Sequence, residues 1–280
     1  MHAVYASTAR CTRGDVRLPY HGVVSDPIDS RRWCSDPSLD TATALQALTG
    51  GVLAILGRLV EASNTTLLCD VTLPAPLPDG TETVHAVYKP IRGERPLDDF
   101  PDGTLAFREV AAWEVSEVLG GSVVPPTVLR DGPMGQGALQ LWIDVDASED
   151  VLRMILTRDD RLRVFALLDA LTNNADRKGG HILPTGNGAV HGCDHGICFA
   201  VEPKLRTVLW GWKGDPLTPD ELAAVRRVRA SLDGELGGRL TELLSAREVA
   251  ATRRRADSLL AAGTFPEPDP WRHVIPWPPF

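Results

Sequence analysis

The chain contains two stretches with different hydrophobic patterns. Between residues 41 and 143, short apolar and β-branched runs alternate with turn-forming residues, which predicts strands with short connections. The expected strands cover residues 52–59, 66–73, 82–89, 123–129 and 137–143, and the first three should form an antiparallel meander. Helices are expected at residues 41–47 and 104–119, with turns at Pro78-Asp79-Gly80 and Asp131-Gly132.

Beyond residue 144 the apolar residues follow a helical period. Val164, Leu167, Leu168 and Leu171 fall at positions i, i+3, i+4 and i+7, which indicates a helix with one buried face. Thr218-Pro219-Asp220-Glu221 is a capping box with proline at the first helical position. We therefore expect helices at residues 161–171, 218–232 and 239–260, and short strands at 181–183 and 189–193.

These patterns divide the chain into three regions. Residues 1–40 show no sustained period and are rich in Arg, Ser, Asp and Pro, so we expect a flexible extension. Residues 41–143 predict an N-terminal lobe, rich in β-structure with one helix, and residues 144–280 a larger helical lobe. The fold class is therefore α+β with two lobes, and a cleft between two such lobes is a natural ligand site.

Composition limits the partners and the compartment. Acidic residues outnumber basic ones by 37 to 29, so the net charge of −8 argues against nucleic acid as a partner. No apolar run approaches the roughly 20 residues of a membrane helix, and we expect no stable membrane insertion. The five cysteines form no CxxC pair, so we expect them to be reduced and the protein to be cytoplasmic.

The strongest candidate for chemistry is a pair of carboxylates. Asp176 lies in the polar stretch 173–181, and Asp194 lies in Gly192-Cys193-Asp194-His195-Gly196, just past an expected hairpin. The hairpin can bring both carboxylates together, as phosphoryl transfer requires: one accepts the hydroxyl proton and the other holds a metal on the phosphates. The alternative is that both fragments are turns, which Asn, Asp and Gly favour. No P-loop, Rossmann, GxSxG or HExxH motif is present.

Five short motifs in this order resemble a known family. They are Val87-Tyr88-Lys89-Pro90, Arg108-Glu109-Val110-Ala111-Ala112-Trp113, Val124-Pro125-Pro126-Thr127, Gln140-Leu141-Trp142, and Asn174-Ala175-Asp176-Arg177 with His181 and Asp194-His195-Gly196. Together they resemble phosphatidylinositol 3-/4-kinases, above all the type II 4-kinases and related bacterial proteins, and more distantly HipA-type serine/threonine kinases. The resemblance implies a protein-kinase-like two-lobe fold, with ATP and Mg²⁺ or Mn²⁺ as cofactors.

The resemblance also implies a nucleotide site in the first lobe. Lys89 would hold the α- and β-phosphates, and Glu109 would fix it by an ion pair, although each is also typical of a solvated charge. Glu114 is an alternative partner, but it lies roughly 140° around the helix from Glu109, so only one of them can face the cleft. Ser63 and Asn64 lie in the first hairpin loop, where backbone amides would cover the phosphates. Gln140 is part of the hinge motif, and Leu141, Trp142 and Ile143 would flank the adenine or simply form core.

The implied roles in the second lobe concern transfer and metal binding. Asp176 would be the catalytic base and Asp194 a metal ligand. Arg177 and Lys178 would neutralise the transferring phosphoryl group, or simply face solvent. His181 departs from the family, which has asparagine there as a metal ligand. Imidazole is a softer ligand than an amide oxygen, so we expect either a changed metal preference or only one tightly held ion.

Three alternatives remain open from the sequence. His181, His191, Cys193, His195 and Cys198 are residue types that bind zinc, and three of them would share one face of a strand. The change at His181 would also suit a pseudokinase, a nucleotide-binding module without transfer. For an active kinase the acceptor would be the hydroxyl of a lipid, a protein or a small metabolite.

Overall fold

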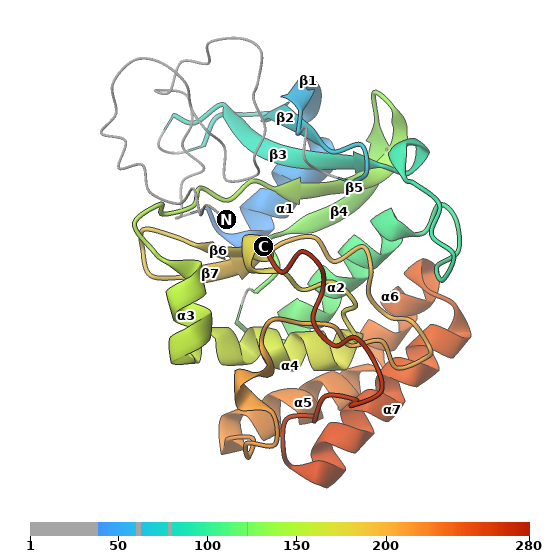
Figure 1. Cartoon of the computed structure of the whole chain (residues 1–280). Coiled ribbons are helices and arrows are strands. Elements are labelled where there is room, and N and C mark those ends of the chain that lie inside the picture. Colours follow the sequence, from blue (N-terminus) through green and yellow to red (C-terminus); the bar gives the residue numbers. More distant parts are fainter. Residues whose placement is uncertain (1–38, 60–62, 78–79, 122) are drawn as a thin grey trace.

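The computed structural model describes residues 39–59, 63–77, 80–121 and 123–280. The expected extension at residues 1–40 lies almost wholly outside the described residues, and so does most of the expected turn at Pro78-Asp79-Gly80. In the described part, a small antiparallel sheet lies above a larger group of helices (Figure 1). The α+β class expected from the sequence is therefore confirmed.

The first lobe is built on a five-stranded antiparallel sheet. In spatial order its strands are β1 (Val52–Arg58), β2 (Leu67–Thr72), β3 (Thr83–Pro90), β5 (Gly135–Leu141) and β4 (Thr127–Gly132). Helix α1 (Thr41–Gly50) packs Ala44 and Leu48 against one face of the sheet, beside Ala86 and Tyr88 of β3. Because side chains alternate along a strand, Val87 and Lys89 point to the opposite face.

The β4–β5 hairpin begins later in the chain than the sequence pattern suggested. Pro125 and Pro126 lack the N–H groups that a ladder requires, so the paired strand starts at Thr127 instead of residue 123. Gly132 pairs with Gly135, so Pro133 and Met134 form the turn, two positions further on than the expected Asp131-Gly132.

Helix α2 (Leu105–Leu119) belongs to the core of the helical lobe. Its residues Ala111, Trp113 and Val115 are buried in one cluster with Phe165 and Leu168 of α4. The same cluster includes apolar side chains of α5 and α7, so α2 is enclosed by other elements on nearly every side. The helix that the sequence pattern grouped with the sheet therefore packs against both lobes, since Ala106 and Val110 also contact Ala138 of β5.

The remaining helices differ from the sequence expectation in two places. The elements are α3 (Val151–Thr157), α4 (Arg163–Thr172), α5 (Pro219–Ser231), α6 (Glu235–Leu243) and α7 (Ala246–Ala262), with a hairpin of β6 (Ile182–Pro184) and β7 (Val190–Gly192). The expectation of one helix over residues 239–260 is wrong, because Leu244 is extended and Ser245 starts α7 with its own capping box to Glu248. The short helix α3 was not expected; Asp150 caps its N-terminus.

Residues 264–280, hereafter the tail, return along the helical lobe toward the sheet (Figure 1). The carbonyl of Val274 accepts hydrogen bonds from the Thr207 N–H at 3.0 Å and from the Trp210 indole at 2.8 Å. Further on, the carbonyl of Pro279 accepts from the N–H of Gly179 at 2.8 Å. The tail therefore contacts the polar stretch that contains Asp176.

None of the described helices combines the length and the apolar character that crossing a membrane requires.

Candidate active site

A lysine held between two carboxylates lies where the sheet meets the helical lobe. Lys89 on β3 forms an ion pair with Glu109 on α2, and its Nζ is 3.1 Å from Oδ1 of Asp194 in the loop after β7. The second oxygen of Glu109 accepts a hydrogen bond from the backbone N–H of His195 at 3.0 Å. Three segments distant in sequence therefore meet at Lys89, Glu109 and Asp194, hereafter the lysine cluster.

The charges of this cluster stabilise one another. Burial alone would lower the pKa of Lys89, but the Asp194 and Glu109 carboxylates raise it above its ordinary value. The Lys89 charge in turn lowers the pKa of Asp194. Lys89 is thus a cation and Asp194 an anion at neutral pH, which suits a site that binds phosphate groups and a metal.

The choice between the two candidate partners of Lys89 follows from the helix geometry. Glu109 faces the sheet and makes the expected ion pair. Glu114 points away from Lys89 and pairs with Arg239 on α6, within the helical lobe. The angular separation of these two glutamates around α2 explains why only one of them reaches Lys89.

The backbone at Asp194 has an uncommon conformation. Its φ is +61°, in the left-handed region that Asp adopts more readily than most residues. This turn directs the carboxylate toward Lys89 on one side and His181 on the other, where its Oδ2 is 3.4 Å from the imidazole Nε2. Uncommon backbone at a charged, convergent position is typical of functional sites.

Asp176 occupies the stretch between α4 and the β6–β7 hairpin. Its backbone N–H donates to the side chain of Asn174 at 2.9 Å, which shapes the turn, and Lys178 lies 3.4 Å from its carboxylate. Burial raises the pKa of Asp176, and the nearby charge of Asp194 raises it further. The two carboxylates that the sequence singled out are therefore electrostatically coupled.

Arg177 departs from both placements expected for it. Its side chain is fully buried and bonds to Asp169 on α4, with nitrogen–oxygen distances of 2.9 to 3.2 Å. It also donates to the Cys193 carbonyl at 3.2 Å and lies 2.6 Å from Nε2 of His195. Arg177 therefore faces neither phosphate nor solvent, and it ties the Asp176 stretch to the Asp194 loop.

Asp169 was not identified from the sequence. Its carboxylate is fully buried and accepts from Arg177, from the Asn174 amide at 2.9 Å and from the Thr207 hydroxyl at 3.1 Å. The sequence did contain one indication of its role. Asp169 lies among apolar residues of the expected helix 161–171, and an acid that is buried with such residues needs a partner.

His181 lies where the resemblance placed it, beside Asp194. Burial lowers its pKa to about 4, so the ring is neutral at neutral pH, and Nδ1 accepts a hydrogen bond from the Lys178 N–H at 3.4 Å. A neutral imidazole with Nε2 toward a carboxylate can share a cation with it. The residues that could hold a metal are thus Asp194 and His181, one hard oxygen donor and one borderline nitrogen donor.

The zinc alternative is not supported. Across residues 39–59, 63–77, 80–121 and 123–280, no three or more His, Cys, Asp and Glu side chains are grouped so that they could hold a metal ion. Strand β7 ends at Gly192, and His195 instead faces Arg177. The expected common strand face for residues 191, 193 and 195 therefore does not form.

The other residues expected to contact the nucleotide have different surroundings in the structure. Asn64 accepts a hydrogen bond from the Arg95 N–H at 2.8 Å, and Ser63 is exposed beside it. The Gln140 side chain is buried and donates to the Thr127 hydroxyl at 2.9 Å, so it joins β5 to β4. The structure brings neither Ser63 nor Gln140 into contact with the lysine cluster through any described interaction.

Trp142 is buried in a small apolar group on the sheet. The group, hereafter the apolar patch, consists of Leu59, Leu68, Val87 and Trp142. Val87 lies two residues before Lys89 and so shares its face of the sheet. The apolar patch is therefore a buried cluster that includes a residue on the same face of the sheet as Lys89.

Comparison with known proteins places this chain in a family. No family model matches the chain. The chain is 44% identical over 268 residues to Protein Rv2133c of Mycobacterium tuberculosis, with 83% of this chain and 94% of that protein covered. The chain therefore belongs to the family of Protein Rv2133c.

Two further proteins are similar to parts of the chain. Phosphatidylinositol 4-kinase gamma 4 of rice (Oryza sativa) is 31% identical over 153 residues, which is 47% of this chain and 27% of that protein. The chain thus matches about a quarter of the length of the rice protein. The crystal structure of CtkA, a proinflammatory kinase of Helicobacter pylori, matches with a TM-score of 0.45 and 12% identity, covering 78% of this chain and 94% of that chain.

Proposed function

We propose that this chain is an ATP-dependent phosphotransferase of the phosphatidylinositol 3-/4-kinase-like type, which transfers the γ-phosphoryl group to a hydroxyl acceptor. The observation that carries the proposal is the ion pair of Lys89 with Glu109, held beside Asp194 at the junction of the lobes. A lysine on the third strand, a helix glutamate that fixes it and an aspartate beyond the hairpin are the parts this chemistry requires. The similarity of the matched segment to a plant phosphatidylinositol 4-kinase supports the same reading.

Each residue of the cluster has a distinct task in this proposal. Lys89 donates to the phosphate oxygens of ATP, and Glu109 keeps its ammonium group in place. Glu109 acts on Lys89 alone, so it is a positioning residue.

Transfer itself requires a base near the acceptor. Asp176 accepts the proton of the acceptor hydroxyl while that oxygen forms a bond to the γ-phosphorus. The bond between the γ-phosphorus and the β–γ bridging oxygen breaks, and ADP leaves with the electron pair. The raised pKa of Asp176 makes its carboxylate a better proton acceptor than an exposed aspartate.

The donor set fits a divalent cation shared with phosphates. Asp194 and His181 are the protein groups that would hold it, and Mn²⁺ suits their mixture of oxygen and nitrogen better than Mg²⁺ does. When bound, the cation neutralises charge on the phosphates during transfer.

Labelled ATP tests the proposal. We expect Lys89→Ala and Asp194→Ala to lose metal-dependent ATP binding, measured by calorimetry. Asp176→Asn should bind ATP normally and lose about 10²- to 10⁴-fold in transfer of γ-label. Lys213→Ala, an exposed lysine outside the site, is the control and should match the wild type. Normal binding and transfer in all three site variants would refute the proposal.

A second function is favoured by one residue. His181 stands where the resembled family has asparagine, and its neutral ring faces the proposed metal ligand Asp194. The protein could then bind nucleotide without transferring phosphate. If the wild type does not transfer γ-label and His181→Asn does, the nucleotide-binding function is supported. If the wild type itself transfers γ-label, the nucleotide-binding function is excluded.

The acceptor is identified by where the label goes. Incubation with γ-labelled ATP, with and without phosphoinositide vesicles, separates label on lipid from label on the protein itself. Label that transfers only from α-labelled ATP would show adenylate transfer, and the phosphotransferase proposal would then be wrong.

A further inference from the structure

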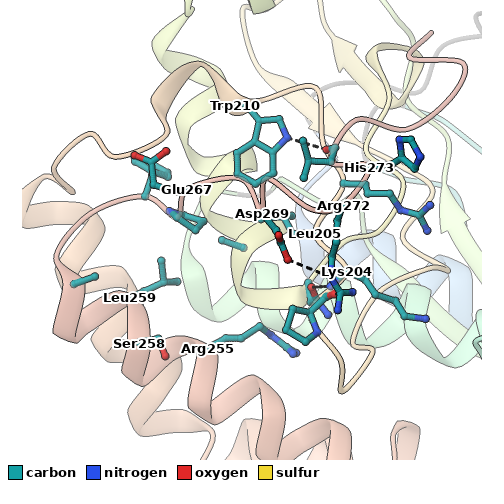
Figure 2. Close-up of a pocket in the computed structure, with 18 of the residues that line it drawn as sticks. Lys204, Leu205, Trp210, Arg255, Ser258, Leu259, Glu267, Asp269, Arg272 and His273 are labelled. Carbon is teal, nitrogen blue, oxygen red and sulfur yellow. Dashed lines mark hydrogen bonds and ion pairs between the residues drawn. The ribbon is translucent and has the colours of Figure 1, made fainter.

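A cavity of about 750 Å³ lies in the helical lobe, away from the lysine cluster. Helix α7, residues 203–210 and residues 264–274 of the tail form its walls. Figure 2 shows Arg255 and Leu259 of α7 on one side, with Arg272 and His273 of the tail on another. None of the residues of the lysine cluster lines it, so the two sites are separate.

Two of the three acidic side chains that line the cavity are paired with cations. Asp99 pairs with Lys204 at 2.6 Å, and Asp269 pairs with Arg272 at 3.2 Å. The third acid, Glu267, lies against the backbone of Gly214. Two lining arginines, at positions 206 and 255, are left without a carboxylate partner within 4 Å among the described residues.

Arg255 is held in place by neutral groups. Its guanidinium donates to the carbonyls of Leu171 at 2.7 Å and Ala200 at 3.2 Å, and to the Thr252 hydroxyl at 2.8 Å. These bonds use three of its five N–H groups and supply no opposite charge. Burial lowers the pKa of Arg255 to about 10, so the cation is poorly compensated.

Arg206 is fixed by its backbone, and no described side chain pairs with its guanidinium. Its N–H donates to the Asn174 carbonyl at 2.9 Å, and its carbonyl accepts from the Arg177 N–H at 3.0 Å. The side chain lines the cavity, and its charge acts on the carboxylates of Asp99 and Asp176. Two guanidinium groups thus reach one cavity from different elements, with their backbones rigidly held.

The rest of the wall is largely apolar. The side chains concerned are Leu205, Trp210, Leu259, Phe265 and Val274. The cavity size falls within the range of about 300–1,000 Å³ typical of small-molecule sites. Apolar walls with a few convergent charged groups favour a ligand that has an apolar body and one charged end.

We propose that this cavity binds a small amphiphilic anion, with its phosphate or carboxylate group on Arg206 and Arg255 and its aromatic or aliphatic body on the apolar walls. Planar guanidinium groups match such anions with paired hydrogen bonds. The proposal does not depend on phosphotransfer, because it uses no residue of the lysine cluster. The same chemistry could come from a soluble metabolite or from the head of a membrane lipid.

Calorimetry with 1-naphthyl phosphate tests the site. We expect one binding site per chain, and about tenfold weaker binding or more in Arg206→Gln and Arg255→Gln, which is at least about 1.4 kcal/mol. Arg254→Gln is the matched control, since Arg254 is an exposed neighbour on α7 that does not line the cavity. The neutral analogue 1-naphthol should bind at least about tenfold more weakly than the phosphate.

Two further measurements distinguish loss of binding from unfolding, and this cavity from the proposed nucleotide site. Arg206→Gln removes no described side-chain bond and should melt like the wild type, so its loss of binding cannot come from unfolding. Lys89→Ala should bind 1-naphthyl phosphate normally, which separates this site from the proposed nucleotide site. Equal binding by the wild type and Arg206→Gln, or by 1-naphthol and its phosphate, would overturn the proposal.

Vesicles identify the source of the anion. Co-sedimentation with phosphatidylcholine vesicles that contain phosphatidylserine, lost in both Arg206→Gln and Arg255→Gln, would indicate a lipid ligand. Arginine-dependent binding of 1-naphthyl phosphate without co-sedimentation would indicate a soluble one. Co-sedimentation that both arginine variants retain, with no binding of 1-naphthyl phosphate, counts against the cavity.

Discussion

The buried pair of Arg177 and Asp169 shows how one residue can serve the site without touching a ligand. Arg177 joins α4, the Asp176 stretch and the Asp194 loop through a single guanidinium group. Removing a charge from water is costly, and the bonds to Asp169 offset that cost only while both partners are present. The pair therefore holds two loops of the candidate active site in register.

Arg177→Ala should destabilise the protein strongly. The change leaves Asp169 buried and without its cation, and we expect a loss of about 3–5 kcal/mol in the free energy of unfolding, measured in urea. The neighbouring Lys178→Ala, at a partly exposed side chain, should change stability by less than about 0.5 kcal/mol. An Arg177→Ala protein as stable as the wild type would show that the pair does not brace the loops.

At the scale of elements, the tail and the Asp176 stretch meet at a glycine. A Cβ atom on Gly179 would overlap the Phe280 ring, whereas one on Gly180 would meet nothing within 4 Å. The backbone of Gly179 also donates to Pro279 at 2.8 Å. Close approach, and not a special backbone angle, is therefore the reason for glycine at this position.

Gly179→Ala should release the end of the tail. The added methyl displaces Phe280, and we expect faster proteolysis near Trp277, followed by mass spectrometry. Gly180→Ala is the matched control and should leave cleavage unchanged. The double variant Gly179→Ala/Phe280→Ala should lose the steric clash, and cleavage no faster than in Phe280→Ala alone would support this reason. Equal cleavage in Gly179→Ala and Gly180→Ala would contradict it.

A second element-scale interaction joins α4 to the start of α5. Glu221 accepts two hydrogen bonds from Arg163, at 2.7 and 2.9 Å, and one from the Thr218 N–H at 2.8 Å. Burial alone would raise the pKa of Glu221, but these bonds lower it below its ordinary value. The carboxylate therefore stabilises the fold in its charged form.

We expect Glu221→Gln to reveal this contribution as a difference in stability that depends on pH. A lowered pKa in the folded state gives stability that is present above the ordinary pKa of about 4.3 and is lost as pH falls through the folded value. We expect the variant to be less stable by about 1.5–3 kcal/mol at neutral pH, with the difference shrinking in acid. Glu242→Gln, an exposed change on α6, is the control; a difference that stays constant with pH would contradict the prediction.

On the scale of the whole molecule, α2 joins the two lobes. Its residue Glu109 belongs to the lysine cluster, while Arg108 forms a buried ion pair with Glu248 on α7 at 2.6 Å and donates to the Cys198 carbonyl at 2.8 Å. The apolar side chains of the same helix complete the core of the helical lobe. The two lobes therefore share a structural element and should lose their structure together.

Arg108→Ala tests that coupling. We expect one thermal transition in the wild type and in the variant, coincident by circular dichroism and tryptophan fluorescence. The variant should lose about 3–5 kcal/mol, because Glu248 is left without its partner. Arg247→Ala, an exposed change on α7, should leave the transition in place. Two separate transitions, of which only one moves, would show that the lobes unfold independently.

Short-range pattern was enough to identify most elements and the main chemical groups. Apolar periodicity located the strands of the meander and helix α4, and a capping box located the start of α5, because these signals depend on residues close in sequence. The motif order located Lys89, Glu109 and Asp194, which do meet. Local pattern failed at Leu244, where the helix ends in an apolar stretch without glycine or proline.

The sequence by itself therefore determined the α+β class, the two kinds of lobe and the identity of the charged residues at their junction. Only the tertiary structure decided which charges are paired: it buried Arg177 against Asp169, turned Glu114 toward Arg239 and left Arg206 and Arg255 without a carboxylate partner among the described residues. The physical reason is range, since secondary structure follows from nearby residues, whereas burial and ion pairing depend on partners far apart in the chain.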